Sequence, residues 1–380
     1  MIKPFLYFLK IYLCIILLSF NTHYLYSKIT IEKDTASVTL SNIKYFDKDH
    51  FLIEGTVIPD SLKESPYDRL PISYKNYVRK PVWDLSKSSA GLSIRFLSNS
   101  SKISAKWEVL NDFKMAHMPD TGIKGIDLYY KSKNGWQFLS TGFPTGNKNE
   151  SVLIQNMTNE IREYKIFLPL YDGVNNIEIG IDSNSFIKKG DFKSDNFIIF
   201  YGTSITQGGC ASRPGMAHTN IISRKLDVNV LNFGFSGNGR MEKPIAELIS
   251  NVKPLFYVIE CMPNMINSDN IVKNTRPLVD IIREKNPETP IVLVDLFDYS
   301  FSVLDLETKL STEKMNSALK IEYEKLLNSG YRNIFYINSK NSIGTDQEGT
   351  VDGVHFTDLG FMRYSSFLIE KFNSLELIKQ

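Results

Sequence analysis

The alternation of hydrophobic and polar positions changes near residue 190. From residue 28 to about residue 190, short segments such as GIDLYYKS and NNIEIGI alternate apolar and polar side chains, and clusters of Asn, Asp, Gly, Ser or Pro separate them. A period of two is typical of strands with one buried face, and many short strands at this spacing predict a β-sandwich. An Asn-Gly pair between Lys133 and Trp136 predicts a hairpin. We therefore expect an all-β, jelly-roll-like sandwich over residues 28–190.

A polar linker, residues 187–196, precedes a different pattern. Apolar runs predict buried strands at residues 197–201, 228–233, 256–260, 291–296 and 333–337. Longer segments predict helices near residues 215–226, 241–251, 269–286, 312–329 and 358–374. Strands that alternate with helices predict a parallel sheet covered on both faces. We expect an α/β domain over residues 195–380, with its active site at the carboxyl ends of the strands.

The first 27 residues are typical of a targeting segment. Lys3 and Lys10 flank the start of an apolar run that extends to Phe20, and a polar stretch ends near Ser27. This order predicts a secretory signal peptide cleaved near Ser27–Lys28, and an uncleaved membrane anchor is the alternative. The apolar run is short for a membrane span, which favours cleavage. We expect a periplasmic or extracellular protein without stable membrane insertion after cleavage.

Composition indicates a folded globular protein, and the net charge bears on which partners it could bind. Of the 380 residues, 42% are hydrophobic and 12% aromatic, as in a folded globular protein. The formal net charge is +2, and removal of residues 1–27 would take away two lysines and no acidic residue. The mature chain would then be neutral, which gives no support for a nucleic-acid or membrane-surface partner.

A hydroxyl group lies where the first strand of the α/β domain turns into a helix. In FIIFYGTSITQGG, residues 197–209, Ser204 follows an apolar strand and precedes two glycines. Such a turn lifts the hydroxyl out of the sheet, and the N-terminus of the helix stabilises developing negative charge. Ser204 is therefore a candidate nucleophile, and a plain helix N-cap is the alternative.

Asp352 and His355 are the candidate partners of Ser204. Their spacing in DGVHFTDLG lets the carboxylate hold the Nδ1–H of His355 while Nε2 faces a serine. His355 would then act first as general base and later as general acid. An isolated Asp-x-x-His pair is more often a helix cap, but this pair follows three other motifs at predicted strand ends.

Those motifs also offer donors for an oxyanion, which acyl transfer requires. The candidates are the backbone N–H groups of Ser204 and Gly237, in NFGFSGNG, and the side-chain amide of Asn264, in ECMPNM. Each of these motifs follows a predicted strand. A turn glycine and a loop asparagine are the respective alternatives.

The motifs GTSITQG, NFGFSGNG, CMPN and DGVH resemble blocks one, two, three and five of the SGNH (GDSL-type) hydrolases, in the order of that family. The resemblance implies a three-layer α/β/α, flavodoxin-like domain with Ser204 as the nucleophile. It also implies that Asp352 and His355 complete the triad, and that Gly237 and Asn264 join the Ser204 N–H in the oxyanion hole. The hydrolysis that it implies needs no cofactor.

The resemblance extends to the first domain and has two departures. GIDLYY, Gly125–Tyr130, resembles the signature of an N-terminal β-domain found beside one SGNH subgroup. Thr203 stands where the family has the aspartate of Gly-Asp-Ser, and block three keeps Asn264 without the aspartate that usually follows. The aspartate of Gly-Asp-Ser is not the triad acid, so its loss does not imply inactivation. The departure in block three bears on the shape of the acyl pocket more than on the mechanism.

Five further residues are weaker candidates. Cys210 and Cys261, the cysteines outside the predicted signal peptide, suggest a disulfide in an exported protein, and two buried free thiols are the alternative. Arg213 is a candidate for substrate binding or for a structural ion pair. His117 is a candidate to reach over the cleft or a plain loop residue, and His218 is interpreted as a packing residue. The sequence has no metal-binding Cys/His spacing, Walker loop or dinucleotide fingerprint.

Together these features predict a secreted serine esterase that acts on a small-molecule or glycan ester. A β-sandwich beside an SGNH domain resembles carbohydrate esterases that remove acetyl groups, so we expect a carbohydrate O-acetylesterase. A broad-range lipase or aryl-esterase is the alternative among enzymes. A non-catalytic carbohydrate-binding protein is the alternative of another class.

Overall fold

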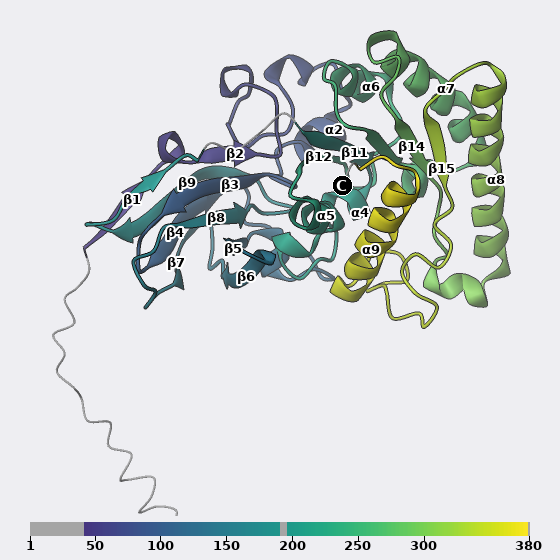
Figure 1. Ribbon diagram of the computed structural model, residues 1–380. Coiled ribbons are helices and arrows are strands. Elements are labelled where there is room, and N and C mark those ends of the chain that lie inside the picture. The colour runs from purple at the N-terminus through teal and green to yellow at the C-terminus, as the bar shows by residue number, and fades with distance from the viewer. Residues whose placement is uncertain (1–41, 191–195, 379–380) are drawn as a thin grey trace, which may run out of the picture. The chain divides into compact units, whose positions relative to one another are not determined.

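The computed structural model describes residues 42–190 and 196–378 (Figure 1). The predicted signal peptide, the alternating segments KITIEK (28–33) and ASVTL (36–40) that predict the first two strands, and residues 191–195 of the predicted linker lie outside the described residues. From Ile43 onward the chain belongs to one unit. Within the described ranges, no helix is both long enough and apolar enough to cross a membrane.

Two antiparallel sheets form the framework of residues 42–190. In the first sheet the order is β1 (Ile43–Phe46), β9 (Val174–Asp182), β4 (Ile103–Val109) and β7 (Lys148–Ile154). In the second the order is β10 (Ile187–Lys188), β3 (Ser93–Ser98), β8 (Arg162–Phe167), β5 (Ile126–Ser132) and β6 (Gly135–Gly142), with β2 (Leu52–Glu54) paired to β3. Apolar side chains of both sheets, among them Phe96, Trp107 and Ile166, meet in one core. Since alternate residues of a strand share a face, this core confirms the predicted all-β region.

Short helices and one hairpin connect these strands. The helices are η1 (Lys48–His50), η2 (Asp60–Leu62), η3 (Ile72–Tyr74), α2 (Lys80–Leu85) and α3 (Asp120–Ile123). Strands β5 and β6 form the predicted hairpin, in which Ser132 pairs with Gly135. Its two loop residues are Lys133 and Asn134, so the loop lies one residue earlier than the Asn-Gly pair predicts. Gly135 has a φ of +92°, which glycine adopts readily.

The second half of the chain folds around one parallel sheet. Its strand order is β12 (Asn229–Gly234), β11 (Phe197–Gly202), β13 (Tyr257–Glu260), β14 (Ile291–Val294) and β15 (Ile334–Ile337). Its α-helices are α4 (Ser204–Gln207), α5 (His218–Leu226), α6 (Lys243–Ser250), α7 (Ser268–Lys285), α8 (Leu306–Asn328) and α9 (Asp358–Ser374). Three further 3-10 helices are η4 (Pro214–Met216), η5 (Met262–Asn264) and η6 (Ser300–Val303). This flavodoxin-like order confirms the predicted α/β fold, and its switch point, where ligands bind in such sheets, lies between β11 and β13.

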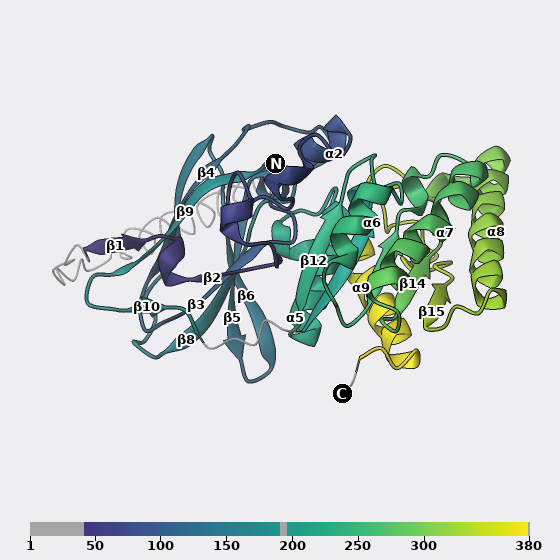
Figure 2. The same cartoon turned by 90° about the horizontal axis from the view of Figure 1, so that it is seen from above.

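Helices cover both faces of the parallel sheet (Figure 2). Helices α6, α7 and α8 contribute to the core that contains Ile199 and Ile259. Helices α5 and α9 contribute to the core that contains Phe200 and Val258. Neighbouring strand residues thus point to opposite buried faces, which explains why these strands are continuous apolar runs in the sequence.

The segment between β2 and β3 packs against the α/β half, although it precedes that half by more than a hundred residues. Leu70 and Val82 belong to the same apolar core as helices α6 and α7. The Arg69 guanidinium, which is buried, donates to the carbonyl oxygens of Asn232 and Gly234 at 3.1 and 2.6 Å. The carboxyl end of β12 is therefore stabilised by a residue from the first half of the chain.

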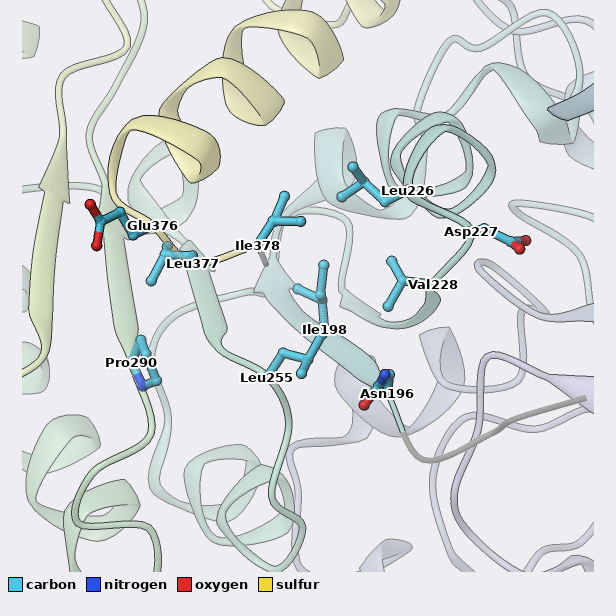
Figure 3. Close-up of a pocket in the computed structure, with 10 residues that line it drawn as sticks. All are labelled: Asn196, Ile198, Leu226, Asp227, Val228, Leu255, Pro290, Glu376, Leu377 and Ile378. Atoms are coloured by element: carbon cyan, nitrogen blue, oxygen red, sulfur yellow. The ribbon is translucent and has the colours of Figure 1, made fainter. Parts of the chain in front are cut away.

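A cavity of about 520 Å³ lies at the amino ends of the parallel strands (Figure 3). Asn196, Val228, Leu255 and Pro290 line it just before β11, β12, β13 and β14 begin, and Ile378 closes it from the C-terminal segment. Because Ser204 follows the carboxyl end of β11, this cavity is at the opposite end of the sheet. It is therefore not the site that the sequence motifs predict.

Candidate active site

Ser204 is the first residue of α4, directly after the turn that ends β11. Thr203 is the N-cap residue: its hydroxyl accepts from the Ile205 N–H at 3.3 Å, and the Thr206 hydroxyl accepts from the Thr203 N–H at 3.2 Å. This reciprocal capping box satisfies N–H groups at the start of the helix. Thr203 thus has the capping role that was the alternative for Ser204, whose hydroxyl contacts His355 instead.

The structure brings Ser204, His355 and Asp352 together in one chain of hydrogen bonds. Ser204 Oγ lies 2.8 Å from His355 Nε2, and His355 Nδ1 lies 2.7 Å from Asp352 Oδ2. Asp352 Oδ1 accepts from the backbone N–H groups of Val354 and His355 at 3.0 and 2.8 Å. Partial burial opposes ionisation of Asp352, but these hydrogen bonds outweigh it and lower its pKa to about 2. An ionised Asp352 accepts from Nδ1–H, which leaves Nε2 to accept from the Ser204 hydroxyl.

The loop after β12 and the turn after β13 lie beside each other. Asn264 ends η5, and its side-chain oxygen accepts from the Gly239 N–H at 3.2 Å. This contact leaves the Asn264 amide N–H groups for another acceptor. Gly237 has a φ of +69° and open space where a Cβ would stand, so backbone conformation and not packing favours glycine there. Arg79 holds the same loop by donating to the Asn238 side chain at 2.8 Å.

The antiparallel half contributes side chains to the surroundings of the triad. The ring centroid of His117, which is exposed, lies 5.7 Å from that of His355. The Tyr171 hydroxyl lies 3.4 Å from the Ser204 carbonyl oxygen and 3.4 Å from Ser236 Oγ. Sequence reasoning named His117 but missed Tyr171, because no motif or period marks a tyrosine in the loop after β8.

A buried polar network lies behind Ser204. The Glu260 carboxylate accepts from the Tyr364 hydroxyl at 2.7 Å, from the Thr206 hydroxyl at 3.0 Å and from His218 Nε2 at 3.0 Å. The interpretation of His218 as a packing residue is incomplete, because its ring stacks on Phe361 and also contacts this carboxylate. Glu260 begins the motif ECMPNM, yet the sequence alone gave no sign that it reaches the helix of Ser204.

Arg213 is part of an ion pair that joins the two halves of the chain. Its guanidinium donates to Asp127 Oδ2 at 2.7 Å and to the Tyr129 hydroxyl at 2.6 Å. Burial raises the pKa of Asp127, and the charge of Arg213 partly offsets this rise. Because Asp127 and Tyr129 belong to the motif GIDLYY, the structure supports the ion-pair interpretation of Arg213 over the substrate-binding one.

The structure corrects the predicted disulfide, since Cys210 and Cys261 are both free and buried. Cys261 Sγ lies 3.5 Å from the Tyr201 carbonyl oxygen, within the apolar core of helices α6 and α7. Cys210 lies instead beside the rings of His117 and His355. An even number of cysteines does not specify where the side chains point, and here the two thiols face different surroundings.

Two family profiles match the chain. The profile of the GDSL-like lipase/acylhydrolase family matches residues 195–373. The GxDLY profile, which describes the N-terminus of SGNH-hydrolase-type esterases, matches residues 43–187. No curated protein matches the sequence.

Solved structures are similar over nearly the whole described chain. A protein described as a GDSL-like lipase from Bacteroides ovatus ATCC 8483 is 34% identical with a TM-score of 0.84, covering 89% of this chain and 99% of its own. The salicylyl-acyltransferase SsfX3 is 15% identical with a TM-score of 0.72, covering 88% of this chain and 98% of its own. A family two carbohydrate esterase from Cellvibrio japonicus is 10% identical with a TM-score of 0.58, covering 89% and 99%. At these lower identities the similarity concerns the fold alone.

Proposed function

This chain belongs to the GDSL-like lipase/acylhydrolase (SGNH) family of carboxylic ester hydrolases, and we propose that Ser204, His355 and Asp352 are its catalytic triad. The observation that carries the proposal is the continuous contact from Ser204 Oγ through the His355 ring to the Asp352 carboxylate, at 2.8 and 2.7 Å. A serine hydroxyl becomes nucleophilic when a positioned base removes its proton, and a third group must hold that base in the right tautomer.

The mechanism is a two-step acyl transfer. His355 Nε2 takes the Ser204 proton as Oγ attacks the ester carbonyl, and the ionised Asp352 stabilises the imidazolium that forms. The Ser204 N–H, the Gly237 N–H and the Asn264 amide stabilise the oxyanion. His355 then protonates the leaving alcohol, and the acyl group stays on Ser204. Water, activated by His355, hydrolyses the acyl-enzyme and restores the free hydroxyl.

The proposed substrates are O-acetylated carbohydrates. The side chains of His355 and Asp352 are 24% and 39% exposed, so the triad is open to a polymer or to a sugar at a surface. His117 gives the antiparallel half a polar ring beside the reacting groups. The fold likeness to the family two carbohydrate esterases is compatible with this choice.

One observation favours the alternative of a lipase or aryl-esterase. Phe301, Val303 and Leu304 are exposed apolar side chains at η6. The Phe301 ring lies against Gly353, inside the motif DGVH, and the Ser300 N–H donates to the Gly353 carbonyl at 3.1 Å. An apolar surface this close to the triad could accept a long acyl chain.

The acyl chain length separates these two functions. We expect p-nitrophenyl acetate to be hydrolysed with a kcat/KM at least tenfold higher than p-nitrophenyl octanoate, and acetate to be released from at least one of a panel of acetylated glycans. The matched control Leu304→Ser should leave acetyl hydrolysis unchanged. A preference for the octanoyl ester that Leu304→Ser abolishes would replace the acetylesterase proposal with the lipase one.

We also propose that the protein is exported, on the basis of residues 1–27. The N-terminus of the protein recovered outside the cytoplasm should begin near Lys28. Recovery of the full-length chain in the membrane fraction would favour the anchor instead.

A further inference from the structure

Three side chains beside the triad form a group that the proposed mechanism does not explain. One nitrogen of His117, one nitrogen of His355 and the Sγ atom of Cys210 all lie within 4.8 Å of one another. They come from three separate segments: a loop of the antiparallel half, the loop after α4 and the motif DGVH. Imidazole nitrogen and thiolate sulfur are the ligands that Zn²⁺ prefers, and ligand atoms of a tetrahedral site lie roughly 3.5 Å apart. The three atoms, at up to 4.8 Å, would therefore have to move closer by roughly 1 Å on binding.

We propose that His117, Cys210 and His355 form an inhibitory binding site for a thiophilic divalent cation, with Zn²⁺ as the probe. Three protein ligands and one water would complete a tetrahedral site, and the exposed His117 ring leaves an entry path from solvent. The inference rests on the proposed function, because inhibition requires that His355 be the catalytic base.

Occupation of this site is incompatible with the triad. Both ring nitrogens of His355 already have partners, Ser204 Oγ at Nε2 and Asp352 Oδ2 at Nδ1. A metal ion on Nε2 would take the lone pair that receives the serine proton. A metal ion on Nδ1 would displace the carboxylate that orients the ring. Either arrangement stops catalysis at the step in which Ser204 becomes a nucleophile.

Cys210 is the buried member of the group, with a side chain that is 5% exposed. A metal ion binds the thiolate and not the thiol, so binding must displace the thiol proton. On binding, the S–H bond breaks, an S–Zn bond forms and the proton passes to solvent, with no change in oxidation state. Metal binding is accordingly expected to release one proton.

A direct binding measurement tests the site without relying on esterase activity. Co²⁺ titrated into the Ser204→Ala protein should give the near-ultraviolet charge-transfer band of a thiolate–cobalt bond, and added Zn²⁺ should abolish it. The band should disappear when Cys210→Ala is added to Ser204→Ala, and it should persist with Cys261→Ala, the matched control for a buried thiol. Absence of the band, or a band that survives the loss of Cys210, would overturn the proposal even if the protein is an active esterase.

Inhibition is the second measurement, with each variant normalised to its own activity without metal. Zn²⁺ should inhibit p-nitrophenyl acetate hydrolysis by the wild-type enzyme, and EDTA should restore it. Cys210→Ala and His117→Gln should each raise the half-inhibiting Zn²⁺ concentration at least tenfold, and Cys261→Ala should not. Circular dichroism checks folding, and the exposed His117 provides a test that does not disturb the buried loop. Equal inhibition of all four proteins would refute the site.

Discussion

Two histidine–carboxylate pairs flank the nucleophile helix, and they differ in what surrounds them. His355 and Asp352 are partly exposed, and Nε2 of His355 faces Ser204. His218 and Glu260 are buried, with side chains 0% and 7% exposed, and their carboxylate accepts from Thr206. Each pair thus contacts a hydroxyl of α4, the first through its imidazole at Ser204 and the second through its carboxylate at Thr206.

Both pairs combine an imidazole with a carboxylate, so residue type alone does not explain their different functions. The difference lies in whether the histidine can reach a bound substrate. A general base must be within reach of the proton of a reacting group, which the exposed pair allows and the buried pair does not. The buried pair instead fixes Thr206, whose hydroxyl completes the capping box that orients Ser204. We therefore expect the exposed pair to control turnover and the buried pair to control stability.

The largest loss of turnover is expected when the nucleophile Ser204 or the base His355 is removed. Ser204→Ala and His355→Ala should each lower kcat for p-nitrophenyl acetate by on the order of a thousandfold or more, with the double variant little worse, because triad members act as a unit. Circular dichroism should show both variants folded. If the wild-type protein and Ser204→Ala hydrolyse the ester at the same slow rate, Ser204 is not the catalytic nucleophile.

Asp352→Asn should have the next largest effect, a loss in kcat of about a hundredfold or more, because Asn cannot favour the required tautomer of His355.

The pKa of Asp352 is lowered to about 2, so its charge contributes stability above its usual pKa, near 3.8. That contribution should be lost as the pH falls through 2. Denaturant unfolding of wild type and Asp352→Asn should accordingly converge between pH 4 and pH 2. A difference that stays constant over this range would contradict the assigned charge.

A smaller effect on turnover, with a clear effect on stability, is expected for the buried pair. His218→Ala should lower the free energy of unfolding by about 3 kcal/mol, because it leaves a cavity and removes a partner of the buried carboxylate. Turnover of the folded protein should fall less than tenfold. The exposed pair of His50 with Asp47, 3.3 Å apart, is the control, and His50→Ala should change neither quantity appreciably. A folded His218→Ala protein as inactive as His355→Ala would abolish the distinction between the two pairs.

The smallest expected effect is the reactivity of the Cys210 and Cys261 thiols in the folded protein. Burial raises the pKa of Cys210 to about 12 and raises that of Cys261 further, so little thiolate exists in the folded protein at pH 8. A thiol reagent should react slowly with the native mature protein. After unfolding without reductant, the same reagent should label two thiols per chain. An unfolded protein with no reactive thiol would reinstate the disulfide.

Much of the fold follows from the sequence, because local patterns carry it. The parallel strands are buried on both faces and therefore appear as apolar runs, as in Phe197–Gly202. Their carboxyl ends share one edge, so motifs after successive strands could be expected to converge. The contact between Ser204 and His355, 151 residues apart in sequence, is of this kind.

Other features depend on partners that no local pattern specifies. Nothing periodic marks Arg69 as a buried donor to the end of β12, or Arg213 as the partner of Asp127. The direction of the Cys210 and Cys261 side chains is likewise set by packing in three dimensions, which is why counting cysteines predicted a bond that the structure lacks. Sequence patterns thus predict where strand ends lie, but not which buried polar groups meet behind them.

The most direct test of the central claim is covalent labelling by a fluorophosphonate, followed by peptide mapping. Only a serine activated by a neighbouring base reacts rapidly with this reagent. We predict one adduct on the peptide that contains Ser204, formed rapidly in wild type and in His218→Ala, and at least a hundredfold more slowly in His355→Ala. An adduct on another residue, or labelling of Ser204 that does not depend on His355, would contradict the proposal that the exposed pair activates this serine.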